Sequence, residues 1–121
     1  MSDIVTPMQV ERRLLQLSKE LDEATQMLHD AEHGYMDSKT TYEVAAAKAR
    51  MHHKQRAINR GIKATVQEID DESLLACREE LTMLNTTEAI VRSARANLAR
   101  IRTQIDIARS IGTSVRASME G

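Results

Sequence analysis

The sequence predicts an all-α protein, an elongated helical hairpin of two long helices that assembles into a homo-oligomeric bundle. Two observations predict this fold. Apolar and small residues recur at alternating steps of four and three along most of the 121 residues, which is the heptad spacing of one face of a long helix. The chain also has no Trp, no Phe and only two Tyr, so it lacks the side chains that usually fill a compact core. We expect one helical domain over residues 1–121.

The first helix is expected over about residues 7–58. Thr6 can cap its start, Pro7 suits the first helical position, and Gln9 can bond back to Thr6 as in a capping box. Gly34 is a weak point inside this helix that allows close approach of another helix. The apolar positions form a seam: Val10, Leu14, Leu17, Leu21, Ala24, Leu28, Ala31, Tyr35, Ser38, Tyr42, Ala45 and Ala49. The seam fades after Ala49.

A basic connection is expected at about residues 59–65, followed by a second helix over about 66–119. Gly61 can take the left-handed conformation that ends a helix. Thr65 and Glu68 match a second capping box. The poor helix formers Asn85, Thr86 and Thr87 predict a kink, with a boundary between a short and a long helix as the alternative.

Four arginines stand seven residues apart beside the apolar seam of the second helix. They flank its heptad positions, and Leu98, Ile101 and Ile105 lie at the centre of this seam. We interpret the stripe as organising helix against helix or subunit against subunit, with contact to a phosphate backbone as the alternative. Asp106 is expected to neutralise part of it within the same helix. The four are Arg95, Arg102, Arg109 and Arg116.

The formal net charge of -1 conceals alternating acidic and basic blocks. Residues 44–67 contain six cations and no acid, whereas residues 68–88 contain seven acids and one arginine. An uncompensated basic segment attracts phosphates of any sequence, so these cations are the candidate nucleic-acid-binding residues. The alternative is a solvated helix end that pairs with acidic blocks of a neighbouring subunit. The six are Lys48, Arg50, Lys54, Arg56, Arg60 and Lys63.

Other chemistry has little support in the sequence. His29 and His33 have the spacing of two metal ligands, but no motif completes a site, and neither a metal nor another cofactor is expected. His52 and His53 are interpreted as part of the basic segment. No glycine-rich phosphate loop or nucleophile motif is present, so we expect no enzyme and no small-molecule substrate.

The sequence also indicates a compartment. Cys77 is the single cysteine, it falls on the apolar seam, and it is expected to be inert. A chain with no possible internal disulfide and no signal-peptide pattern is expected in the reducing cytoplasm. No apolar run approaches the roughly 20 residues that cross a bilayer, so no membrane association is expected.

Two stretches carry a resemblance to known proteins: residues 34–45 (GYMDSKTTYEVA) and 98–110 (LARIRTQIDIARS). With them the chain resembles small all-helical proteins of bacteriophage early regions and, more distantly, the UvsY-type recombination mediators of phages. That resemblance implies a ring-like homo-oligomer that binds single-stranded DNA through basic residues and helps to load a recombinase, in the cytoplasm of the host cell. The chain departs from the family in having almost no aromatic residues.

The resulting expectation is a non-enzymatic, oligomeric accessory protein that binds nucleic acid, with single-stranded DNA and a recombinase as partners. The competing interpretation is a structural or protein-interaction coiled-coil module without nucleic-acid binding, either an assembly scaffold or an inhibitor of a host protein. The two interpretations differ in what the basic blocks contact: phosphates in the first, other protein subunits in the second.

Overall fold

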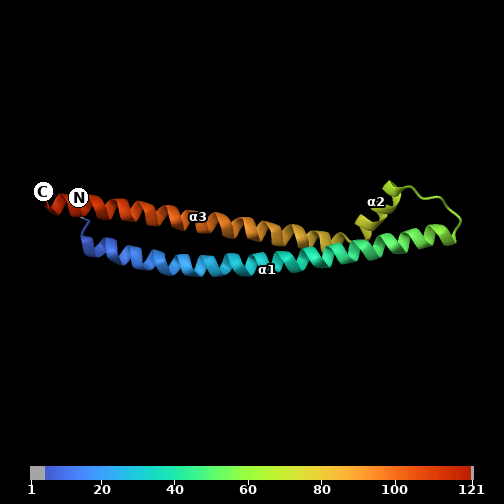
Figure 1. Cartoon of the computed structure of the whole chain (residues 1–121), viewed down its shortest axis with the longest axis horizontal. Helices are drawn as coiled ribbons and strands as arrows, with labels where there is room; N and C mark the ends of the chain where they lie inside the picture. The colour runs from blue at the N-terminus through green and yellow to red at the C-terminus, as the bar shows by residue number, and fades with distance from the viewer. Residues whose placement is uncertain (1–4, 121) are drawn as a thin grey trace. The chain divides into compact units, whose positions relative to one another are not determined.

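The computed structural model describes residues 5–120, which form three α-helices and no strand (Figure 1). The helices are α1 (Pro7–Asn59), α2 (Val66–Ala76) and α3 (Arg78–Glu120). The all-α class is therefore confirmed. The bounds of α1 lie within one residue of those expected, but the second expected helix is present as two.

Where the sequence indicates one domain, the chain divides into two compact units. Unit 1 comprises Met1–Asp30 and Arg92–Gly121, and unit 2 comprises Ala31–Val91. Unit 1 is therefore built from the two ends of the chain. Unit 2 contains the second half of α1, all of α2 and the first turns of α3.

Local hydrogen bonds explain where α1 begins. The backbone N–H of Gln9 donates to the hydroxyl of Thr6 at 3.3 Å, and the Thr6 N–H donates to the Gln9 side-chain carbonyl at 2.9 Å. These reciprocal bonds satisfy two donors that the first helical turn would otherwise leave unpaired. The capping box predicted from the sequence is confirmed.

A Schellman motif ends α1. Gly61 has a φ of 65°, in the left-handed region that favours glycine. Its N–H donates to the carbonyl of Ile58 at 3.1 Å, and the N–H of Ile62 donates to that of Ala57 at 3.0 Å. This pair of bonds satisfies the last carbonyls of α1 and turns the chain toward α2. The predicted left-handed position of Gly61 is confirmed.

The second expected helix breaks at Cys77, eight residues before the expected kink. Thr65 caps α2 by accepting a hydrogen bond from the N–H of Glu68 at 3.1 Å. At the far end of α2, Cys77 has a φ of -107° and a ψ of 25°, which differ from helical values. The chain therefore changes direction between α2 and α3 at this residue (Figure 1).

No kink occurs at residues 85–87, because α3 runs through them without interruption. The hydroxyl of Thr86 donates to the carbonyl of Thr82 at 2.9 Å, and that of Thr87 donates to the carbonyl of Met83 at 3.0 Å. Each hydroxyl thus finds its partner within the helix instead of competing with the backbone. The kink predicted at residues 85–87 is wrong. The alternative, a boundary between a short and a long helix, is correct, but this boundary lies at Cys77.

The core of unit 1 lies between the start of α1 and the end of α3, which run antiparallel. Leu17 and Ala24 on α1 are buried, with exposed fractions of 0% and 2%. Half-buried leucines of α1, at positions 14, 21 and 28, pack against the same cluster. From α3 the cluster takes Leu98, Ile101, Ile105 and Ala108.

In unit 2, residues of α1 and α2 and the junction between α2 and α3 contribute buried and half-buried side chains. Tyr35 and Tyr42 are half-buried on α1, while Ser73 of α2 and Cys77 are buried. The Ser73 hydroxyl donates to the carbonyl of Ile69 at 2.7 Å, so its burial leaves no unpaired polar group. Gly34 has open space around it: a Cβ atom there would meet nothing within 4 Å.

Candidate nucleic-acid interface

The six candidate cations all lie in unit 2, around the end of α1. Lys48, Arg50, Lys54 and Arg56 are on the helix, whereas Arg60 and Lys63 belong to the connection that follows it. All six are exposed. The Schellman turn positions Arg60 and Lys63 on either side of Gly61, so the basic segment continues past the helix end.

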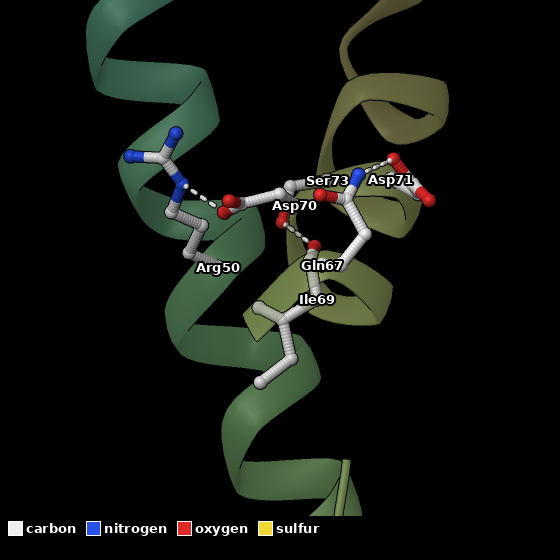
Figure 2. A network of polar contacts seen from close by, with 6 residues as sticks. All are labelled: Arg50, Gln67, Ile69, Asp70, Asp71 and Ser73. Atoms are coloured by element: carbon white, nitrogen blue, oxygen red, sulfur yellow. Dashed lines mark hydrogen bonds and ion pairs between the residues drawn. The ribbon is translucent and has the colours of Figure 1, made fainter. Parts of the chain in front are cut away.

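Although residues 44–67 contain no acid in the sequence, acidic side chains of α2 lie close to them in the folded chain. Figure 2 shows Arg50 of α1 and Asp70 of α2 facing each other, with Nε and Oδ1 3.2 Å apart. Both side chains are about half exposed, a setting in which an ion pair contributes about 0.2–1 kcal/mol. Asp70 shares its helix with Asp71, whose carboxylate accepts a hydrogen bond from Gln67 at 2.8 Å. The basic segment is thus partly neutralised by its own chain.

His53 belongs to the packed face of α1, contrary to its interpretation as part of the basic segment. Its side chain is only 14% exposed, and its Nδ1 lies 2.9 Å from Oε2 of Glu72 on α2. That buried nitrogen makes no hydrogen bond among the described residues, and its contact with Glu72 is an ion pair only when His53 is protonated. Ala49, His53 and Ala57 are all half-buried, because steps of four residues keep them near one helix face.

A row of basic side chains remains exposed on α1 and its end. Lys48, His52, Arg56 and Arg60 succeed one another at four-residue steps and are all exposed. Four residues turn a helix by about 400°, so each member lies only about 40° around from the last. Within the described residues, none of the four takes part in an ion pair. Such a row can follow a chain of phosphates.

A cleft of about 240 Å³ separates this row from α2. Arg56 and Arg60 line it from the side of α1, and Glu68 and Glu72 line it from α2. Cations on one side and carboxylates on the other direct an anionic ligand toward α1 and away from α2. The remaining lining residues are His53, Ala57, Ile62, Ala64 and Ile69.

The arginine stripe of α3 lies in unit 1. The seam residues beside it, Leu98, Ile101 and Ile105, are part of the core that α3 forms with α1 of the same chain. Arg102 and Arg109 are exposed, and neither forms an ion pair with Asp106 among the described residues. The expected neutralisation by Asp106 is therefore absent.

Two further arginines complete the stripe. Arg95 is exposed, and Arg116 donates from Nε to the carbonyl of Gly112 at 3.3 Å. Arg109 and Arg116 both line a small depression beside Pro7. Arg109 and Arg116 therefore border the contact between α1 and α3.

The other residue pairs considered in the sequence do not converge on a site. His33 pairs with Asp37 through Nδ1 and Oδ2 at 3.5 Å, and both side chains are about three-quarters exposed. No group of three potential metal ligands occurs within residues 5–120. Nor does any helix there contain an apolar stretch that could cross a membrane.

Sequence reasoning missed the contribution of α2 to this surface. The two contacts that attach α2 to the basic segment, Arg50 with Asp70 and His53 with Glu72, join residues about 20 positions apart. A signal for His53 was available, because it continues the four-residue steps of the seam beyond Ala49. No signal of similar strength indicated which acids would face α1. Comparison of the chain with protein families, with curated proteins and with solved structures gave no significant match.

Proposed function

We propose that this protein is a non-enzymatic, oligomeric accessory protein that binds nucleic acid, with single-stranded DNA as its ligand. The observation that carries the proposal is the exposed row of Lys48, His52, Arg56 and Arg60, which has no ion-pair partner within residues 5–120. Lys54 and Lys63 are also exposed and lie close to this row in the chain. A concentration of cations on one surface is the electrostatic footprint of a phosphate ligand.

Phosphates, not bases, are the groups that this surface can bind. Strong single-strand binders usually stack bases on aromatic side chains. The only tyrosines of this chain, Tyr35 and Tyr42, are half-buried and precede the basic segment. Binding is therefore expected to be independent of sequence and strongly sensitive to salt.

The wider role follows from the resemblance to phage recombination mediators. It consists of binding single-stranded DNA during recombination or replication and helping to load a recombinase, inside the cytoplasm of a phage-infected host. Assembly of several copies would bring several basic rows together, and each added row raises the effective concentration of cations along one strand.

The test is the affinity for a fluorescently labelled single-stranded oligonucleotide, measured by anisotropy over a series of salt concentrations. Replacing Lys54, Arg56, Arg60 and Lys63 together by Gln should abolish most of the binding at low salt. If all four cations contact phosphates, the slope of log affinity against log salt should fall by about 3, since single strands lose roughly 0.7 per contact.

A matched control changes the same net charge elsewhere on the surface. Replacing Arg12, Lys19, Lys39 and Arg100 together by Gln removes four exposed cations that are outside the basic segment. This control should retain most of the affinity. The proposal is wrong if the natural protein does not bind at low salt, or if both quadruple variants bind equally well.

A protein-interaction module without nucleic-acid binding is the second candidate. The observation that favours it is the exposed apolar surface of unit 1, where Leu15 is 73% exposed and Ile107 is 54% exposed. Exposed apolar groups that gather on one surface are typical of protein contacts. In this case the basic row would serve subunit pairing, and the Gln variant of Lys54, Arg56, Arg60 and Lys63 would change the molar mass of the protein instead of its DNA affinity.

A further inference from the structure

An apolar groove lies between α1 and α3 in unit 1. Its volume is about 490 Å³. Leu15 has 73% of its surface exposed, while Ile105 is buried, with 9% of its surface exposed. The lining is mainly apolar: Leu14, Leu15, Leu21 and Ile105, with Ser18, Glu11 and Arg109.

The charged residues of the groove make it complementary to itself. Glu11 lies on the side of α1 and Arg109 on the side of α3. The two do not form an ion pair within the chain, and neither has another ion-pair partner among the described residues. A two-fold axis parallel to these helices would set α1 of one copy on α3 of the other, so that each Glu11 faces the Arg109 of the second copy.

We infer that a second copy of this chain occupies the groove, docking groove to groove with its own Leu14, Leu15 and Leu21. The four helix segments of two unit 1 bodies then enclose a shared apolar layer, as in a four-helix bundle. The inference rests on the proposed function only in expecting an oligomer. It identifies the surface through which that oligomer forms. It does not depend on nucleic-acid binding.

The test is the molar mass of the natural protein and of Leu15→Glu, measured by light scattering and sedimentation over a concentration series. The natural protein should be a dimer or a multiple of dimers. Leu15→Glu should raise the dissociation constant at least about tenfold, because the interface would bury an unpaired charge. Its fold should be preserved, because Leu15 is exposed in the single chain.

The control is Met27→Glu. Met27 is on the same helix, is 62% exposed, and does not line the groove. Circular dichroism should give equal helix content for both variants. The inference is overturned if the natural protein stays monomeric at every concentration, or if Leu15→Glu and Met27→Glu associate equally well.

A charge exchange tests the orientation of the two copies. Glu11→Arg and Arg109→Glu should each weaken association, because each places like charges opposite one another, and the double variant should restore it. Failure of the double variant to recover would overturn the two-fold pairing. Oligonucleotide affinity measured on the same samples separates the two proposals, because DNA binding can be lost with the dimer intact, and the dimer can be lost with residual DNA binding.

Discussion

Val10 and Gly112 are in contact across unit 1, so closely that a Cβ atom added to Gly112 would lie 3.0 Å from Cγ1 of Val10. Such a distance is shorter than ordinary van der Waals contact. Val10 is itself buried, with only 7% of its surface exposed, so it has little room to move away. The glycine at position 112 is therefore needed for the close approach of α1 and α3.

Gly112→Ala and Gly34→Ala should have opposite effects on stability. Both glycines are helical, and alanine favours a helix by about 1 kcal/mol over glycine. At Gly34, where the added methyl meets nothing, we expect the free energy of unfolding to rise by about 0.5–1 kcal/mol. At Gly112, overpacking should outweigh the gain and lower it by about 1–2 kcal/mol.

Chemical denaturation of the two variants checks this difference. A third variant, Val10→Ala with Gly112→Ala, should be less destabilised than the sum of the two single changes, because removal of Cγ1 relieves the clash. Equal stabilisation by alanine at both glycines would show that α1 and α3 can move apart near Gly112 at little cost.

Gly61→Ala should destabilise the protein by about 1 kcal/mol, because the left-handed conformation is sterically unfavourable for residues with a Cβ atom. The φ of Gly61 is 65°, and no atom crowds the position. The cost is therefore conformational, and Gly61→Asn should cost less, since asparagine tolerates this region better. Thermal unfolding of the two variants supplies the comparison, and an equal loss in both would contradict the assignment of strain to φ.

Leu17→Ala should cost about 2–5 kcal/mol of folding free energy, whereas Leu75→Ala should change it by less than about 0.5 kcal/mol. Leu17 is fully buried in the core of unit 1, and Leu75 on α2 is 75% exposed. The chemical change is the same, so the difference measures burial alone. Urea denaturation followed by circular dichroism is the measurement. A loss of stability for Leu17→Ala as small as that for Leu75→Ala would place Leu17 outside the core.

Asp70→Asn with Glu72→Gln should raise the affinity for single-stranded DNA by a few-fold at low salt. These carboxylates face Arg50 and His53, and their removal frees the exposed Arg50 for a phosphate and makes the surface near α1 more positive. Asp22→Asn with Glu23→Gln, which removes the same charge in unit 1, should have a smaller effect. Anisotropy titrations compare the two double variants, and the difference should vanish at high salt as the charges are screened. Identical gains would mean that only net charge matters.

The parts of this fold that follow from short-range rules could be predicted from the sequence. The bonds between Thr6 and Gln9 define the start of α1, and the bond from Gly61 to Ile58 helps to define its end. Each spans only three residues. The break at Cys77 could not be predicted, because neither Gly nor Pro marks it. Strong helix formers lie within a few residues of Cys77 on both sides, so local preference favours an unbroken helix there.

The candidate interface was harder to predict than the helices. The six cations of residues 44–67 are all exposed, whereas their role as nucleic-acid-binding residues stays a prediction. Their pairing was not predicted, because it depends on the angle at which α2 leaves α3 and thus on packing between segments. His53 was assigned by its charge, although its position in the four-residue steps carried the better information.

The origin of unit 1 in the two ends of the chain has a consequence for synthesis. The hydrogen bond between Arg13 and Gln104 joins residues 91 positions apart, and the buried core partners of Leu17 and Ala24 from α3 lie among residues 98–108. At 5–20 residues per second, those partners are synthesised about 5–20 s after early α1, whereas the segments of unit 2 are consecutive in the chain. A chain truncated before residue 98 would keep that face open, so premature termination should produce a species that aggregates or recruits chaperones.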